Sequence, residues 1–177
     1  MRIEVNEVGR REYYDEVLYA ASNYKKFQKN PNKRIKGFIK AMLMPTIAYI
    51  VLTALMLVLF WRDRDLVFLP LAGMLAFVVI FLIIYVVKGN KQIDAMMADK
   101  GTRYIEITKD SVKFEDSKKV IEQKWSNIMN VLLGPHSIIF LPTGTDGALI
   151  TIDRTYEEEV LRAVNEAGYG NLLVEHK

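Results

Sequence analysis

The stretch "LVLFWRDRDLVFL", residues 57–69, places four alternating charges between two long apolar runs. As a single helix, residues 41–87 would reach about 70 Å, whereas the hydrocarbon core of a bilayer is about 30 Å thick. Burying the four charged side chains in that core would be opposed by about 10 kcal/mol. The sequence therefore predicts two membrane spans, residues 41–61 and 66–87, which form a helical hairpin with the charges in its turn.

Lysine and arginine gather ahead of the predicted hairpin. The turn carries only Arg62 and Arg64, whereas the flank directly ahead of the first span carries seven cations: Lys25, Lys26, Lys29, Lys33, Arg34, Lys36 and Lys40. By the positive-inside tendency, this bias predicts both termini in the cytoplasm. No cleavable signal peptide is expected, because the apolar run begins only near residue 41. We therefore expect a multi-pass protein of the cell (inner, cytoplasmic) membrane, with the lipid bilayer as its first partner.

The net charge of +3 is distributed unevenly along the chain. Residues 1–40 have ten Lys and Arg against five Asp and Glu, whereas residues 88–177 have twelve against fourteen. Because the part able to fold as a globule is slightly acidic, we expect no nucleic-acid partner. The sequence contains no cysteine, which excludes disulfides, thiol chemistry and cysteine-ligated metals.

Residues 1–32 are predicted to form a cytoplasmic N-terminal arm. Residues 2–5 alternate as in a short edge strand, and residues 12–28 have the spacing of an amphipathic helix that ends at Asn30-Pro31-Asn32. Its apolar stripe comprises Tyr13, Tyr14, Val17, Leu18, Ala21 and Tyr24. The stripe can lie on the membrane surface or pack against the C-terminal domain. We favour packing, because tyrosine and alanine make a weak insertion face.

After the second span the helical pattern continues to about residue 98, where Gly101 is predicted to cap the helix. Residues 33–98 thus form the hairpin with a helical extension. From residue 103 the apolar period changes to two, which predicts short antiparallel strands at 103–108, 111–115, 119–125, 137–142 and 148–153. A final helix is expected to begin with a capping box of Thr155 and Glu158 and to stop at Gly168. The predicted fold class is an α+β membrane protein whose domain at 103–177 is an antiparallel sheet capped by one helix.

This order of features resembles the YcxB-like family of bacterial membrane proteins. The motifs that carry the likeness are "YIEITKDSVKF" (104–114), "KWSNIMNV" (124–131), which matches the family's Trp-x-x-Ile-x-x-Val element with Trp125, Ile128 and Val131, and "SIIFL" with "LITIDR" (137–154). The resemblance implies a pleckstrin-homology-like (PH-like) domain, a bent sheet of about seven strands capped by a helix. The family brings no established activity, so the resemblance implies a fold and no reaction.

Candidate catalytic and metal sites have plain alternatives. His136 and Ser137 with Asp146 or Asp153 form a nucleophile set on paper, but a histidine after Gly134-Pro135 is typical of a turn, and His176 is the only other histidine. No His or Cys spacing suits zinc. The loop 143–147 resembles a phosphate cradle but lacks the lysine and helix of a P-loop, and Glu157, Glu158 and Glu159 complement a helix dipole. We therefore expect no catalytic, cofactor or metal site.

The strongest candidate is the basic cluster, defined as Lys25, Lys26, Lys29, Lys33, Arg34, Lys36 and Lys40. Each cation near an anionic membrane surface contributes about 1 kcal/mol, although the same residues suffice to set the topology. Trp125 is expected to pack in the core rather than to contact a ligand. Ala72, Gly73 and Ala76 allow close helix approach, within the hairpin or in a homo-oligomer, and we favour the hairpin.

The sequence thus predicts a non-enzymatic interaction or regulatory protein that presents a PH-like domain at the cytoplasmic face, with an unidentified protein partner. One alternative is an anionic-lipid-binding protein that uses the basic cluster and the PH-like domain. Another is a small oligomeric channel or transport subunit, against which neither span has an ionisable residue other than tyrosine.

Overall fold

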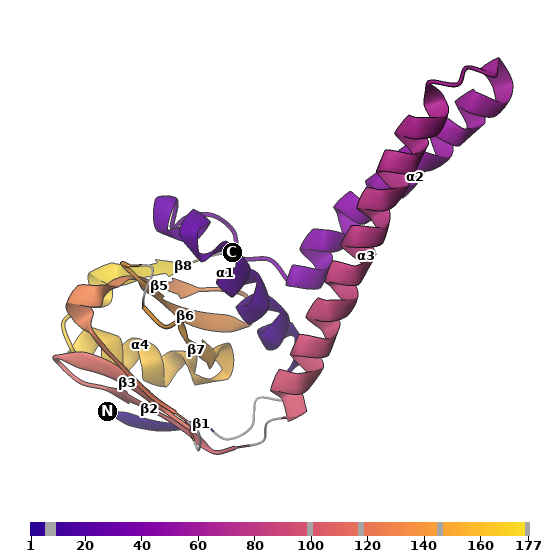
Figure 1. Ribbon diagram of the computed structural model, residues 1–177. Coiled ribbons are helices and arrows are strands. Elements are labelled where there is room, and N and C mark those ends of the chain that lie inside the picture. Colours follow the sequence, from indigo (N-terminus) through magenta and orange to yellow (C-terminus); the bar gives the residue numbers. More distant parts are fainter. Residues whose placement is uncertain (6–9, 99–100, 117–118, 145–146, 176–177) are drawn as a thin grey trace. The chain divides into compact units, whose positions relative to one another are not determined.

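The computed structural model describes residues 1–5, 10–98, 101–116, 119–144 and 147–175. The chain divides into two compact units. The globular unit consists of Met1–Lys36 together with Ala95–Lys177, and the hairpin unit consists of Gly37–Asp94. Figure 1 shows the helices and strands of both.

The hairpin unit is built from two long helices, α2 (Phe38–Asp63) and α3 (Phe68–Ala98). Both are long and apolar enough to cross a membrane, and they include nearly all of the two predicted spans. They run side by side (Figure 1), with the ring centroids of Phe38 and Tyr85 5.3 Å apart. Pro70 lies in the first turn of α3, where a missing N–H costs little. The predicted helical extension reaches Ala98, and the predicted cap at Gly101 follows residues 99–100, which lie outside the described residues.

The four charges of the opening stretch mark the end of α2 and the turn that follows it. Arg64 ends α2 in the left-handed conformation with φ 53°, and its N–H donates to the carbonyl of Phe60 at 2.9 Å. The Asp65 carboxylate accepts from the N–H of Val67 at 3.0 Å, just before α3 begins. All four charged residues are exposed. The predicted break between the helices is therefore confirmed.

Gly89 allows the two helices to approach each other near the start of α2. A Cβ atom at this position would lie 2.4 Å from a ring carbon of Phe38, whose side chain is buried. Glycine has a low helix propensity, yet α3 continues through Gly89-Asn90. The small side chain gives room for an aromatic ring, which offsets its low helix propensity.

We predict that Gly89→Leu destabilises the hairpin by about 1–3 kcal/mol, because the added side chain must displace the Phe38 ring. Thermal loss of helical circular dichroism in detergent measures this effect. Gly73→Leu in the same helix is the matched control, since nothing lies within 4 Å of a Cβ added there. Equal melting of the two variants would contradict the packing described.

The globular unit contains eight strands in two four-stranded sheets. The first sheet has the order β1-β2-β3-β4 and is antiparallel throughout; the second has the order β7-β6-β5-β8. The strands are β1 (Arg2–Val5), β2 (Arg103–Ile107), β3 (Ser111–Glu115), β4 (Val120–Lys124), β5 (Ile128–Leu133), β6 (Ser137–Pro142), β7 (Ile150–Asp153) and β8 (Leu173–Glu175). The second sheet includes the most deeply buried run, since every residue of β6 is buried.

The predicted strands at 103–108, 111–115, 119–125, 137–142 and 148–153 are confirmed with small shifts at their ends. Between β2 and β3 the chain turns at Lys109-Asp110, and the Thr108 N–H donates to the carbonyl of Ser111 at 3.0 Å. Two features differ from the expectation of a single antiparallel sheet. The strands divide between two sheets, and β8 follows the last helix and pairs parallel to β5.

Helix α1 (Arg11–Lys29) packs against β6, as favoured from the sequence. Its buried face differs from the predicted stripe, because Glu16, Tyr19 and Ala20 are buried while Ala21 is exposed. The backbone leaves helical geometry at Asn23, with φ −123°. This kink changes the helical phase, so that Phe27 in the last turns is completely buried.

The last helix, α4 (Glu157–Glu166), lies between the two sheets (Figure 1). The predicted capping box is wrong. The residue that precedes α4 is Tyr156, which makes no side-chain capping hydrogen bond. Thr155 instead donates its N–H, at 2.8 Å, and its hydroxyl to the carboxylate of Asp153. A short 3₁₀ helix, Arg154–Tyr156, precedes α4, and Gly168 with φ 91° follows its end as predicted.

The boundary predicted between an arm at 1–32 and a domain at 103–177 does not separate two units. Strand β1 pairs with β2 from Arg2↔Glu106 to Val5↔Arg103, and α1 packs on β6. A fragment that begins at residue 103 would lose both elements. The globular unit is therefore discontinuous in sequence, with the hairpin inserted between its two parts.

Candidate functional site

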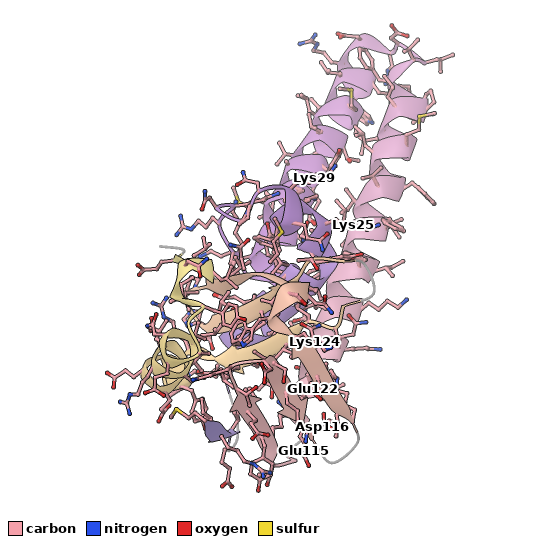
Figure 2. All side chains as sticks on the ribbon, turned by 90° about the vertical axis from the view of Figure 1, so that its left-hand side faces the viewer. Lys25, Lys29, Glu115, Asp116, Glu122 and Lys124 are labelled. Carbon is pink, nitrogen blue, oxygen red and sulfur yellow. The ribbon has the colours of Figure 1, made fainter. Side chains whose placement is uncertain are left out.

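Six of the seven side chains of the basic cluster are exposed to solvent. Lys25, Lys26, Lys29, Arg34 and Lys36 are exposed, and Lys33 is half-buried. Lys40, also exposed, belongs to the hairpin unit. Figure 2 shows Lys25 and Lys29 at the opposite end of the globular unit from Asp116. Because these side chains are accessible, the cluster is available to an anionic partner.

The candidate nucleophile Ser137 and its neighbour His136 make buried hydrogen bonds to Glu16. Ser137 is completely buried, and its hydroxyl donates to Glu16 Oε2 at 2.7 Å. The same oxygen accepts from the N–H of His136 at 3.0 Å. Asp153 is bound to Thr155, and Asp146 and His176 lie outside the described residues. A substrate has no access to the Ser137 hydroxyl in this arrangement.

Glu16 is the central residue of this contact, and the sequence reasoning missed it. Burial raises the pKa of Glu16 above its ordinary value of 4.5, and the hydrogen bonds from Ser137 and His136 oppose part of that rise. Gly134 makes room for the carboxylate, since a Cβ there would lie 2.9 Å from Glu16 Oε2. The sequence did contain a signal for its burial, because Glu16 follows Tyr13 by three positions and so lies on the same face of an amphipathic helix.

Glu157 and the loop 143–147, two further candidates from the sequence, make structural hydrogen bonds. Glu157 accepts from Arg154 at 2.7 and 2.9 Å, and this pairing lowers the pKa of the Glu157 carboxyl. Among the described residues no group of His, Asp or Glu side chains is placed to hold a metal ion. In the loop 143–147, the Gly144 carbonyl accepts from Gln28 Nε2 at 3.2 Å, and residues 145–146 are outside the described residues.

The three residues of the Trp-x-x-Ile-x-x-Val element lie in the core. Trp125 is 3% exposed, Ile128 is 4% exposed and Val131 is fully buried. The indole ring of Trp125 stacks on Tyr169 with 4.3 Å between centroids, and its N–H donates to the carbonyl of Thr108 at 2.8 Å. The burial of Trp125 agrees with the predicted packing in the core, whereas its stacking partner Tyr169, which follows α4, was not predicted.

The small-residue patch divides between two environments. Ala72 is buried and Ala76 half-buried, as expected for packing inside the hairpin. Gly73 is exposed, with nothing within 4 Å of the position of an added Cβ. The patch therefore contributes to the hairpin through its alanines and not through its glycine.

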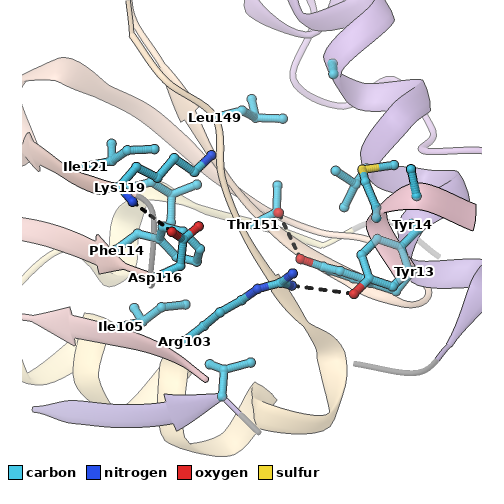
Figure 3. Close-up of a pocket in the computed structure, with 16 residues that line it drawn as sticks. Tyr13, Tyr14, Arg103, Ile105, Phe114, Asp116, Lys119, Ile121, Leu149 and Thr151 are labelled. Atoms are coloured by element: carbon cyan, nitrogen blue, oxygen red, sulfur yellow. Dashed lines mark hydrogen bonds between the residues drawn. The ribbon is translucent and has the colours of Figure 1, made fainter. Parts of the chain in front are cut away.

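A cavity of about 600 Å³ lies in the globular unit (Figure 3). Its walls come from α1, from the last turn of α3, from the first sheet and from the segment that includes β7. One wall carries Tyr13, whose hydroxyl bonds to that of Thr151 at 2.9 Å. Burial raises the pKa of Tyr13, so its hydroxyl stays protonated. Arg103 donates to the hydroxyl of Tyr14 at 3.5 Å.

The cavity combines apolar walls with charged groups. Its apolar side chains include Ile105, Phe114, Ile121, Leu149 and Ile150, and its charged ones are Arg103, Lys119 and Asp116. None of the basic-cluster residues lines it. The sequence reasoning did not identify this site, because its residues come from segments far apart in the chain.

Comparison of the chain with protein-family models, with curated proteins and with solved structures finds no match. The resemblance to the YcxB-like family therefore stays a prediction that depends on the motifs around Trp125. The cavity, the basic cluster and the apolar hairpin are the features from which a function is inferred.

Proposed function

We propose that this protein is a non-enzymatic, membrane-anchored interaction or regulatory module. Helices α2 and α3 cross the cell (inner, cytoplasmic) membrane as a hairpin, and the globular unit is held at the cytoplasmic face. The bilayer is the first partner, and a second protein is the expected target of the globular unit.

One observation carries the proposal, namely where exposed apolar side chains occur. Among the described residues, every exposed large hydrophobic side chain lies between Leu43 and Val87, except those of Met1 and Val120. Soluble monomers rarely expose contiguous apolar patches of more than a few hundred Å². A bilayer removes this cost, and two long helices satisfy their own backbone hydrogen bonds inside it.

The charges support the orientation. Arg62, Asp63, Arg64 and Asp65 are exposed at the end of α2 and in the turn, so the turn belongs in water beyond the membrane. Six cations of the basic cluster precede α2, and Lys40 lies in its first turn. Lys88 and Lys91 lie in the last part of α3. Lys and Arg thus accumulate near the start of α2 and the end of α3, which are the ends away from the turn. This distribution favours a cytoplasmic location for the globular unit.

The globular unit has the character of a binding domain. Two packed sheets with a helix after β7 support the PH-like fold that the YcxB-like motifs imply. The Ser137 hydroxyl is bound to Glu16 in the core, which supports a non-enzymatic role. Binding therefore depends on exposed surface and on the cavity.

Co-purification of the full chain from mild detergent tests the proposal. Trp125→Ala is the matched control, because it is expected to destabilise the globular unit and lies outside α2 and α3. We expect a protein partner that is enriched with the native chain and lost with this variant. If no protein is enriched over the variant in repeated preparations, the interaction role is wrong.

A second candidate, binding of anionic lipid, is favoured by the exposure of the basic cluster. Replacing Lys25, Lys26 and Lys29 together with glutamine is expected to weaken attraction to an anionic surface by about 3 kcal/mol. Hydrogen exchange of residues 22–36 in nanodiscs, with and without anionic lipid, measures this. We expect anionic lipid to slow exchange in the native chain only. The same exchange with both lipids would contradict this candidate.

A further inference from the structure

A row of apolar side chains crosses the first sheet, and three of its members, Ile105, Phe114 and Ile121, form the floor of the cavity. Paired positions connect Ile3 to Ile105, Ile105 to Phe114 and Phe114 to Ile121. Ile3 and Ile105 are buried, whereas Phe114 and Ile121 are only half-buried. In the neighbouring row, Ile107 and Val112 are fully covered. The apolar row is thus less buried at Phe114 and Ile121, toward β4, and the cavity lies over these two side chains.

The charged groups beside this floor have a net positive balance. Arg103 and Lys119 are the two cations of the lining, and Asp116 is its one carboxylate. Asp116 Oδ1 accepts from the backbone N–H of Lys119 at 2.8 Å, so the carboxylate supports the turn between β3 and β4. Lys119 Nζ lies 5.8 Å from the centre of the Phe114 ring. A cation is therefore placed directly above the apolar floor.

The opposite wall positions the second cation. The hydroxyls of Tyr13 and Thr151 bond to each other (Figure 3), so neither requires a ligand. Arg103 extends beside them and reaches the hydroxyl of Tyr14 at 3.5 Å. A guanidinium has five N–H donors in a planar fork, which matches the oxygens of a carboxylate or a phosphate.

We propose that the cavity binds an acidic amphiphile with a single acyl chain. The chain lies over Ile105, Phe114 and Ile121, and the anionic head, a carboxylate or a phosphate, pairs with Arg103 and Lys119. The volume of about 600 Å³ falls within the range of about 300–1,000 Å³ typical of small-molecule sites. This inference rests on the proposed function, because a domain held at a membrane has such amphiphiles within reach.

Photo-crosslinking in nanodiscs of zwitterionic lipid tests the inference with the full chain. The probe is a fatty acid with a diazirine in its chain, and mass spectrometry locates the labelled peptides. We expect labelling of peptides that line the cavity, with competition by oleate or by oleoyl lysophosphatidate. The acid that competes at the lower concentration identifies the head group. Oleyl alcohol and inorganic phosphate are expected not to compete.

Two pairs of variants separate a bound ligand from general contact with lipid. Ala21→Trp fills the cavity from an exposed position of its lining and is expected to reduce labelling about tenfold; Ser22→Trp, exposed and outside the lining, is its control. Lys119→Gln removes one charge-assisted hydrogen bond and is expected to weaken acid binding about tenfold. Its control is Lys109→Gln, an exposed residue outside the lining.

The outcomes distinguish this inference from the proposed function. Failure of the chain to co-elute with nanodiscs contradicts the membrane anchor, and with it the inference. Co-elution in which oleyl alcohol competes as well as the acids, or in which Ala21→Trp labels as strongly as Ser22→Trp, overturns the cavity site alone.

Discussion

Replacing Trp125 with alanine is expected to lower the free energy of unfolding of the globular unit by about 3–5 kcal/mol. The ring is 3% exposed and stacks on Tyr169. Its truncation leaves a cavity between the first strands and the segment after α4, and it removes the hydrogen bond to the Thr108 carbonyl. Hydrogen exchange of the buried amides in β5 and β6 measures the loss, since these amides exchange only when the unit opens.

The second tryptophan of the chain provides the control for this substitution. Trp61 is 74% exposed near the end of α2, so Trp61→Ala is expected to leave exchange in β5 and β6 unchanged. If Trp125→Ala also left this exchange unchanged, Trp125 would not hold the two sheets and the last segment together.

Replacing Glu16 with alanine is expected to destabilise the globular unit by about 2–4 kcal/mol. The Ser137 hydroxyl and the His136 N–H both donate to Glu16 Oε2, and both would lose their partner in the core. Glu16→Gln keeps an acceptor oxygen and is expected to cost less than Glu16→Ala. Urea unfolding in detergent, followed by Trp125 fluorescence in a Trp61→Phe background, measures both variants.

The same contact predicts a pH dependence. Because burial raises the pKa of Glu16 above 4.5, the folded unit favours the protonated carboxyl relative to the unfolded chain. The stability contributed by Glu16 is fully present below pH 4.5 and is lost as the pH rises through the raised pKa. Native protein should therefore lose stability relative to Glu16→Gln over that interval.

Comparing native protein with Glu16→Gln cancels the titration of other carboxyl groups. Glu12→Gln, at an exposed position of the same helix, controls for the amide substitution itself. A constant difference in stability between the native protein and Glu16→Gln across the interval would show that Glu16 is not buried as described.

Features set by local sequence were predictable. The break at residues 62–65 follows from charge and length, and the hairpin at Lys109-Asp110 follows from alternation on both sides of a turn. The helix boundary at Gly168 follows from the conformational freedom of glycine, which has φ 91° there. Each of these depends on residues within one continuous stretch of the chain, where charge, length and periodicity can be evaluated directly.

Features set by distant contacts were not predictable. Strand β1 pairs with β2, although the hairpin separates them in the sequence. Strand β8 follows α4 in the sequence and pairs parallel to β5. Glu16 is buried where α1 packs against β6, and its partner Ser137 is 121 residues away in the chain. The capping box failed because Asp153, and not Thr155, provides the acceptor. The cavity could not be predicted for the same reason, since it forms only where the two sheets and α1 meet.

The most direct test of the membrane anchor uses cysteine labelling, since the chain contains no cysteine of its own. Single cysteines replace Leu66 in the turn, Lys29 in α1 and Glu175 in β8, all of which are exposed. A membrane-impermeant maleimide is added to bacterial spheroplasts that express each variant. We predict that Leu66→Cys reacts in intact spheroplasts, whereas Lys29→Cys and Glu175→Cys react only after permeabilisation. Labelling of Lys29→Cys or Glu175→Cys in intact spheroplasts, or of Leu66→Cys only after permeabilisation, would contradict a hairpin that keeps the globular unit inside.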